Sequence, residues 1–340
     1  MDFAVAEPGR SGRVRPTVGV VIPVYHSAPY IRGSVESVLT QTCPVDQIVL
    51  VDDRGDDDSI EIAQRVLAEY GREHILITQP SNGGLGRARN TGLAALTTDL
   101  VWFLDSDDEA EPDFVDRLVS VLVEADAQIA VARTRRVDID GYTLGIDEAE
   151  PRHAVLSGER YAREILCGRA KAYACTKLFR REILGERPWA QDQAYEDFAS
   201  TLALALSVPR VATVADPLYR YLYREGSLST ALSESTFDLF TVEDQVHDLL
   251  RSRLGDRRWN REYVGFRYRE VLTSVAHVAM RAAHAGGQTP LSRRAVDRVR
   301  GDIALRDLTA LWAGRRYRQM VFAVMVKFTP KLYSTVLQWR

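Results

Sequence analysis

The chain has 340 residues, of which 46% are hydrophobic and 27% are charged, so it can bury one large core or two modest ones. No apolar run approaches the roughly 20 residues that a membrane-spanning helix needs, and the first sixteen residues lack the apolar stretch of a signal peptide. Three widely spaced cysteines form neither a disulfide framework nor a zinc-finger pattern. Composition therefore argues against a secreted, a membrane-spanning and a zinc-finger protein.

The net charge of −3 conceals a division along the chain. Residues 251–340 hold 19 Lys and Arg against 6 Asp and Glu, whereas the first 250 residues hold 25 against 41. The chain thus has an acidic body and a basic C-terminal region. Because the basic region carries no recognition motif for nucleic acid, we do not expect nucleic acid as a partner.

Residues 1–16 are punctuated by Pro and Gly and predict a flexible N-terminal lead. Short β-branched runs then alternate with segments of helical period. This alternation favours a mostly parallel α/β sheet with helices on both faces. The predicted strands are 17–22, which ends at Pro23, 47–51, 74–78, 99–104 and 128–132, and the predicted helices are 29–41, 59–70, 85–96 and 114–123.

After residue 133 the pattern becomes less regular. Asp140-Gly141 predicts a hairpin turn. Helices are expected over 158–166 and 195–206, and strands over 211–214 and 218–221. From residue 236 the chain turns helical, with helices expected over 237–254 and 261–285. We therefore predict an α/β domain over 17–235 and a basic helical region over 236–340.

Polar clusters follow four of the predicted strands. The carboxyl ends of parallel strands meet at one edge of a sheet, and ligands bind there in such folds. We expect one ligand site built from the four clusters, which are Pro23-Val24-Tyr25, Asp52-Asp53, residues 82–86 and residues 105–108.

Asp105 and Asp107 directly follow an apolar strand. Carboxylates spaced in this way can present oxygens to one Mn²⁺ or Mg²⁺ ion, which then bridges the oxygens of a diphosphate. The alternative is an acidic turn that caps the following helix.

After the second strand, Asp52 or Asp53 can accept the imide N–H of a nucleobase, or can simply form a turn before the next helix.

The segment from Asn82 to Asn90 is a glycine-rich turn that leads into a helix. Backbone N–H groups at a helix start, together with Arg89, suit a phosphate or a base edge. Arg89 stands where a dinucleotide-binding motif needs its third glycine, and the Gly-Lys-Ser/Thr of a P-loop is absent. Neither a dinucleotide-dependent enzyme nor a P-loop NTPase is expected.

Glu196 and Asp197 open an apolar helix. An acid at this point can act as a general base if the fold brings it to the 105–108 cluster. Acids are also common in the first turn of a helix for structural reasons alone. The six histidines show no metal-binding pattern.

In this order and spacing, the motifs over residues 18–25, 48–53, 82–92 and 103–108 resemble those of the family 2 glycosyltransferases, whose fold is called GT-A. The resemblance covers residues 17–235. It implies an enzyme with a Rossmann-like sheet. It also implies transfer of a sugar from a nucleotide-sugar, most often a UDP-sugar, to an acceptor hydroxyl with inversion at the anomeric carbon. Only four of the 44 basic residues are lysines, a bias that indicates a GC-rich bacterial genome.

The resemblance also implies roles for individual residues. Asp107, with Asp105, would bind the metal, and Asp197, beside Glu196, would be the catalytic base. Lys177, Arg224 and Ser227 would lie near the acceptor or the diphosphate. The donor nucleotide would contact Pro23, Val24, Tyr25, Asp52, Asp53, Asn82, Gly84, Arg89, Asp105 and Ser106.

Two departures from the family pattern affect these expectations. Many members have a histidine in the motif where this chain has Arg224-Glu225-Gly226-Ser227, so Arg224 is expected to neutralise the diphosphate instead. The Gln-x-x-Arg-Trp motif of processive synthases is absent. This absence favours transfer of a single sugar.

The sequence leaves the acceptor open. One interpretation is a cell-envelope glycan, teichoic acid or lipid-linked acceptor, a second is a small-molecule natural product, and a third is a non-catalytic scaffold that binds nucleotide-sugars.

Three interpretations are open for the C-terminal region: a packed cap, a contact between copies, or a surface that binds an anionic membrane. We expect a cytoplasmic protein, either free or at the inner face of the cell membrane. The membrane interpretation rests on the apolar segments 320–326 and 333–339 beside Arg315, Arg316, Arg318, Lys327 and Lys331.

Overall fold

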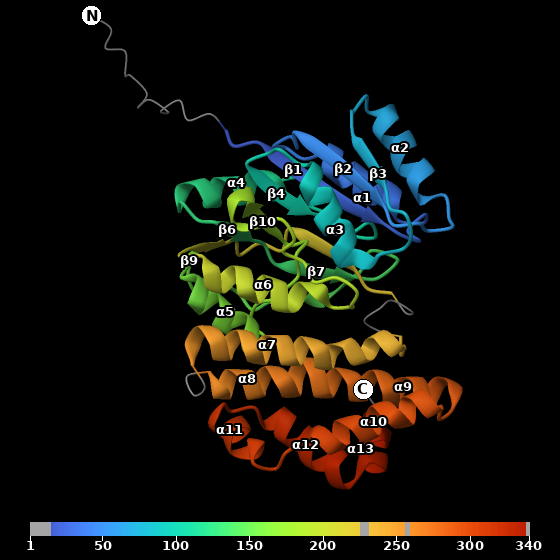
Figure 1. Ribbon diagram of the computed structural model, residues 1–340, viewed down its shortest axis with the longest axis vertical. Helices are drawn as coiled ribbons and strands as arrows, with labels where there is room; N and C mark the ends of the chain where they lie inside the picture. The colour runs from blue at the N-terminus through green and yellow to red at the C-terminus, as the bar shows by residue number, and fades with distance from the viewer. Residues whose placement is uncertain (1–14, 225–230, 256–258, 338–340) are drawn as a thin grey trace, which may run out of the picture.

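The computed structural model describes residues 15–224, 231–255 and 259–337. An α/β layer forms one end of the molecule and a stack of helices forms the other (Figure 1). The predicted fold class, a mostly parallel sheet covered on both faces and followed by a helical region, is confirmed. The predicted domain boundaries stay predictions, and residues 1–14 of the expected N-terminal lead lie outside the described residues.

The main sheet has eight strands in the order β3-β2-β1-β4-β10-β6-β11-β9. Strands β1 to β4 are parallel to one another, whereas β10 runs antiparallel between β4 and β6. The bounds are β1 Val18–Val24, β2 Gln47–Asp52, β3 Ile75–Thr78, β4 Leu100–Phe103, β6 Ile129–Val131, β9 Val155–Leu156, β10 Lys177–Arg180 and β11 Val211–Thr213.

Strand β1 continues through Pro23 to Val24, which corrects the prediction that Pro23 ends it. The residues of β1 that pair with β4 are Val18 to Val21. Pro23 lies beyond this ladder, so the N–H that proline lacks costs no bond to β4.

Helices cover both faces of the main sheet, as the apolar strands require. Val20 and Ile22 of β1 point into the core formed with α1, α2 and α4, whereas Val21 points into the core on the opposite face, formed with α3, α5 and α6. The bounds are α1 Ile31–Leu39, α2 Ser59–Glu69, α3 Gly84–Ala95, α4 Phe114–Glu124, α5 Gly158–Leu166 and α6 Glu196–Ser207, with a 3₁₀ turn at Arg181–Ile183.

A second, four-stranded sheet has the order β5-β12-β7-β8. Its predicted hairpin is confirmed, because β7 and β8 are antiparallel and Gly141 of the turn has a φ of +83°. Strand β12 pairs with β5, which directly follows the 105–108 cluster, so residues after β12 are brought to that cluster. The bounds are β5 Glu109–Ala110, β7 Thr134–Val137, β8 Thr143–Ile146 and β12 Tyr219–Leu222.

The C-terminal helices stack below α5 and α6 (Figure 1). The predicted helix over 261–285 is present, with a π-helical stretch at Arg267–Leu272 between α8 and α9. In the described part of the chain, no helix is long and apolar enough to cross a membrane. The bounds are α7 Asp238–Leu254, α8 Asn260–Phe266, α9 Thr273–Gly286, α10 Pro290–Asp302, α11 Asp307–Ala313, α12 Tyr317–Phe328 and α13 Pro330–Leu337, and a 3₁₀ turn at Glu234–Phe237 precedes α7.

Candidate functional site

The predicted donor residues and the predicted base lie where β1, β2 and β4 end and where α3 and α6 begin. Pro23 and Val24 are buried at the end of β1, and Tyr25 beyond them is exposed. The Tyr25 ring stacks on His26, with 4.0 Å between the ring centroids. An exposed aromatic at the carboxyl edge of the sheet gives a flat apolar surface of the kind that a nucleobase can stack on.

Asp53 holds the glycine-rich turn in place. Its two carboxylate oxygens accept the backbone N–H groups of Gly83 and Gly84 at 2.8 and 2.9 Å, and Asn82 Oδ1 accepts the Gly84 N–H as well at 3.1 Å. Gly84 has a φ of +77°, a conformation that favours glycine. Asp52, which is half-buried, accepts the N–H of Arg54. Asp53 thus positions the start of α3.

Arg89 is buried between two carboxylates. Its guanidinium donates to Asp105 Oδ1 at 2.7 Å and to Glu196 Oε1 at 2.5 Å, and it lies over the ring of Trp189. Burial alone would lower the pKa of Arg89, but Asp105 and Glu196 raise it, so the guanidinium stays charged. Arg89 therefore joins the end of β4 to the start of α6 through paired, charge-assisted hydrogen bonds.

The three acids that follow β4 have different surroundings. Asp107 Oδ2 accepts a hydrogen bond from Arg224 at 2.7 Å, and burial raises the pKa of Asp107 although Arg224 opposes this. Asp108 is buried, and its two oxygens accept from the Tyr219 hydroxyl and the Leu222 N–H, both at 2.9 Å. Asp108 thus ties the loop to β12. Ser106 is buried within the same loop.

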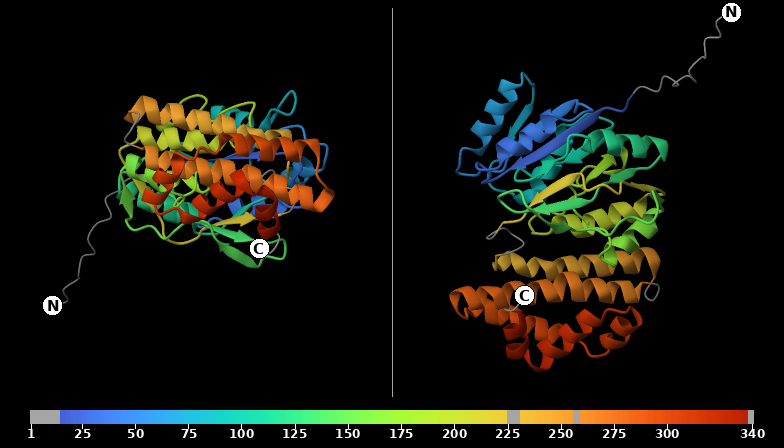
Figure 2. Two further views of the ribbon diagram at one scale, coloured as in Figure 1. Left: turned by 90° about the horizontal axis from the view of Figure 1, so that it is seen from below. Right: turned by 180° about the vertical axis from the view of Figure 1, so that it is seen from behind.

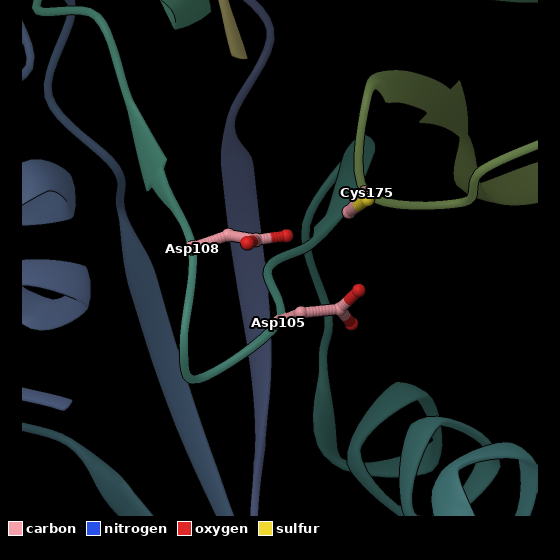
Figure 3. Close-up of side chains that lie close together, drawn as sticks. All are labelled: Asp105, Asp108 and Cys175. Carbon is pink, nitrogen blue, oxygen red and sulfur yellow. The ribbon is translucent and has the colours of Figure 1, made fainter. Parts of the chain in front are cut away.

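Two sets of side chains near the end of β4 can be compared as metal ligands. Asp105, Asp108 and Cys175 place one ligand atom each within 4.8 Å of one another (Figure 3). This set does not fit a divalent cation, because both oxygens of Asp108 are engaged and burial raises the pKa of the Cys175 thiol well above its usual range.

Asp105 and Asp107 fit a hard cation better. Each pairs with an arginine through one carboxylate oxygen, Oδ1 in Asp105 and Oδ2 in Asp107, and can offer its other oxygen. Oxygen ligands from carboxylates are those that Mg²⁺ and Mn²⁺ prefer. The donor set of this chain is therefore compatible with a divalent cation at Asp105 and Asp107.

Glu196 and Asp197 occupy the first turn of α6. Tyr195, just before them, has a φ of +58°, so the chain turns sharply into the helix. Burial raises the pKa of Glu196 to about 7 despite the neighbouring Arg89. Burial also raises the pKa of Asp197, although Arg89 lowers it. Asp197 is thus a more basic carboxylate than a solvent-exposed aspartate.

Asp197 lines a cavity of about 200 Å³. The cavity lies between α6 and the C-terminal helices, and sequence reasoning did not anticipate that those helices would contribute to it. The polar lining residues besides Asp197 are Lys171, Tyr173, Tyr195, Thr236, Glu270 and Ser274. The helical region therefore forms one wall of the space in front of the acid.

The remaining predicted residues lie in different settings. Lys177 is fully buried, and its ammonium donates to the Lys171 and Tyr173 carbonyls and to the Thr176 hydroxyl. Burial lowers the pKa of Lys177 to about 8. Arg224 is half-buried, pairs with Asp107 and lies over the Tyr30 ring. Ser227 lies outside the described residues.

Trp189 escaped the sequence analysis, which also gave Gly86 no packing role. Trp189 packs beside Arg89 and exchanges two hydrogen bonds with the Asn90 side chain, and Gly86 lets α3 approach this loop. The sequence does contain a sign of this packing, because Gly86 lies inside a helical segment. Glycine destabilises the interior of a helix, so a glycine at such a position indicates close packing.

Comparison with known proteins identifies the family of this chain. The sequence model described as Glycosyl transferase family 2 matches residues 19–187, about half of the chain. The succinoglycan biosynthesis protein ExoO of Rhizobium meliloti is 29% identical over 287 residues, which are 82% of this chain and 82% of ExoO.

Solved structures share the fold. S. aureus TarS 1–349 in complex with UDP-GlcNAc matches 93% of this chain and 92% of its own, with a TM-score of 0.68 at 17% identity. Mannosyltransferase PcManGT from Pyrobaculum calidifontis, in complex with GDP-Man and Mn²⁺, matches 94% of this chain and 88% of its own, with a TM-score of 0.53 at 16% identity. The order of the motifs, the family match and the shared architecture agree: the chain belongs to the family 2 glycosyltransferases and has the GT-A fold.

Proposed function

We propose that this enzyme transfers one sugar from a UDP-sugar to an acceptor hydroxyl, with inversion at the anomeric carbon and with a bound divalent cation. The observation that carries the proposal is the Arg89 bridge. Arg89 binds Asp105, on the donor side, and Glu196, the neighbour of Asp197 in α6. The buried Arg89 guanidinium thus holds Asp105, a ligand of the proposed metal site, close to Asp197, the candidate base.

The donor side has the charges that the leaving group needs. A nucleoside diphosphate gains negative charge as the sugar departs, and Arg224 beside Asp107 can help to neutralise it. A cation held by Asp105 and Asp107 would supply further Lewis-acid stabilisation of the diphosphate. The similarity to TarS in complex with UDP-GlcNAc supports a UDP-sugar, and Mn²⁺ in PcManGT supports a divalent ion.

The acceptor side has one base facing a cavity. Asp197 takes the proton of the acceptor hydroxyl as its oxygen forms a bond to the anomeric carbon and the bond from that carbon to the diphosphate breaks. Attack opposite the leaving group inverts the configuration. The raised pKa of Asp197 supports this role, since a stronger base accepts the proton more readily.

The acceptor belongs, in this proposal, to cell-envelope glycan synthesis. The similarity to ExoO, a succinoglycan biosynthesis protein, supports a growing saccharide rather than a small natural product as the acceptor. The cytoplasmic location stays a prediction of the sequence.

The test replaces Asp197 by Asn, because the amide keeps the shape of the side chain and loses its basicity. We expect UDP binding in calorimetry to stay within about twofold of the wild type, and UDP release from UDP-GlcNAc to fall about 100-fold or more. Asp192→Asn is the matched control, since Asp192 is an exposed acid of the same loop. Wild-type UDP release by Asp197→Asn would show that Asp197 is not the base.

A further inference from the structure

The end of the molecule farthest from the β1–β3 side of the sheet carries exposed apolar side chains. Helices α11, α12 and α13 form this end and are turned towards the viewer in the left view of Figure 2. Four residues of α12 lie on one helical stripe, at intervals of four, three and four residues. Their exposed fractions are Tyr317 55%, Val321 56%, Val324 43% and Phe328 62%.

The helices that pack against α12 also carry exposed apolar side chains. Trp312 at the end of α11 is 65% exposed and Leu332 in α13 is 57% exposed, and both helices pack against α12. We call these six residues the α12 face. Isolated exposed apolar residues are ordinary, but six on three adjoining helices mark a contact surface.

The apolar segment 320–326 is divided between two environments. Phe322, Ala323 and Val326 are buried in the core that links α12 to α9 and α10, whereas Val321 and Val324 face outward. Tyr333 is also turned inward, where its hydroxyl bonds to His277 at 2.8 Å. The α12 face is thus the outer side of a packed helix.

The charges around the α12 face have one sign. Arg306, Arg315, Arg318 and Lys331 are exposed. Two other cations of this region have structural roles: the Lys327 ammonium donates to the Arg300 and Ile303 carbonyls, and Arg316 packs against Gly265.

Acids are nearly absent from the same segment. Asp307 is the single acidic residue in the sequence from 303 to 337, and its carboxylate accepts hydrogen bonds from Arg267 and Tyr268. The described residues of segment 303–337 therefore carry exposed cations and no exposed carboxylate.

We propose that the α12 face docks on an anionic lipid membrane. Tyr, Trp and Phe side chains insert at the boundary between headgroups and acyl chains, and the surrounding cations bind anionic headgroups. A second copy of the chain is the poorer occupant, because two α12 faces in contact would place these arginines and Lys331 against their own counterparts. The inference goes beyond sugar transfer and does not depend on the identity of the donor.

The test is co-sedimentation of the full chain with phosphatidylcholine vesicles, with and without phosphatidylglycerol. We expect binding to the anionic vesicles, and its loss on raising the salt concentration, since screening weakens surface charges. Val321→Asp with Phe328→Asp should lower the partition coefficient at least tenfold. Replacing Arg315, Arg318 and Lys331 by Gln should lower it about fivefold per charge, which corresponds to ~1 kcal/mol each.

The matched control is Ile139→Asp with Tyr142→Asp in the β7–β8 hairpin, where both side chains are 72% exposed on another part of the surface. This control should bind vesicles like the wild type, and circular dichroism should show all variants folded. Equal vesicle binding by Val321→Asp with Phe328→Asp would overturn the proposal. So would a vesicle-free dimer that the same two substitutions dissociate, since the face would then join two copies.

Discussion

Arg89 organises the charges of the site at the scale of single residues. A planar guanidinium can bind two carboxylates at once, which a lysine ammonium at the same point would do with less geometric control. Three acids, Asp105, Glu196 and Asp197, surround this one buried cation. Negative charge is therefore in excess, and the pKa values of Glu196 and Asp197 are raised.

The first prediction concerns Glu196, whose pKa rises from an ordinary 4.5 to about 7 on folding. Between these pH values the native state binds more protons than the unfolded state, so the free energy of unfolding falls as the pH rises. Glu196→Gln removes this dependence. Urea denaturation from pH 4.5 to 7 measures the free energy of unfolding at each pH. Its slope against pH should be smaller in the variant than in the wild type, by up to about 1.4 kcal/mol per pH unit.

The comparison with the wild type isolates Glu196, because Asp107, Asp108 and Asp197 are present in both proteins. Their raised pKa values act in the same direction in each. Profiles of equal slope in the two proteins would show that Glu196 is ionised throughout, with Arg89 compensating for its burial.

The second prediction concerns the metal. If Asp105 and Asp107 share a cation, UDP should bind more tightly in Mn²⁺ than in EDTA, and Asp107→Ala should remove most of that difference. Asp113→Ala, at a half-buried acid that directly precedes α4, should keep this difference. Calorimetric titration measures the UDP affinity of each protein in Mn²⁺ and in EDTA. A metal effect that persists in Asp107→Ala would place the cation elsewhere.

At the scale of elements, the contact between α3 and the 189–190 loop decides where Arg89 lies. Asn90 accepts from the Trp189 N–H and donates to its carbonyl, at 3.1 and 2.8 Å. One turn earlier, a Cβ added to Gly86 would lie 1.9 Å from the Ala190 carbonyl oxygen. The glycine is needed because two segments of backbone approach each other closely there.

We therefore expect Gly86→Ala to push α3 away from this loop. The cost should be about 1–3 kcal/mol of unfolding free energy, as for other overpacked sites, with a loss of UDP binding because Arg89 shifts. Gly301→Ala in α10 is the control: nothing lies within 4 Å of its added Cβ, and alanine is the better helix former by about 0.5–1 kcal/mol. Gly86→Ala with wild-type stability would refute the close contact.

At the scale of the whole molecule, one hydrophobic core joins the sheet to the helical region. The same cluster contains Val21 of β1, Leu202 of α6, Val275 of α9 and Phe322 of α12. Phe266 of α8 packs on Phe198 of α6 with 4.6 Å between the ring centroids. The helical region is thus packed onto the catalytic layer and not merely attached to it.

Phe266→Ala tests this coupling. We expect a loss of about 3–5 kcal/mol, as for other large buried side chains, in a single unfolding transition for sheet and helices. Circular dichroism and tryptophan fluorescence should report the same midpoint in urea. Leu332→Ala, on the exposed surface, should change stability by less than about 0.5 kcal/mol. Separate transitions for the two probes would mean that the helical region unfolds independently.

Local patterns in the sequence determined much of the fold. The strands, the helices and the hairpin at Gly141 follow from apolar period, β-branched runs and turn residues, all of which act over a few neighbouring positions. The order of the polar clusters then indicated the family and the edge of the sheet where the site lies. The end of β1 was misjudged, because the cost of Pro23 depends on how far β4 extends beside it.

Only the tertiary structure decided which side chains meet. Arg89 and Glu196 are 107 positions apart and Asp107 and Arg224 are 117 apart, so no local pattern specifies either pair. These pairings depend on β10 lying antiparallel between β4 and β6, and on β12 returning beside β5. Only the tertiary structure decides burial within residues 320–326 as well. The packing of α12 on α9 and α10 determines which of these side chains are buried and which face outward.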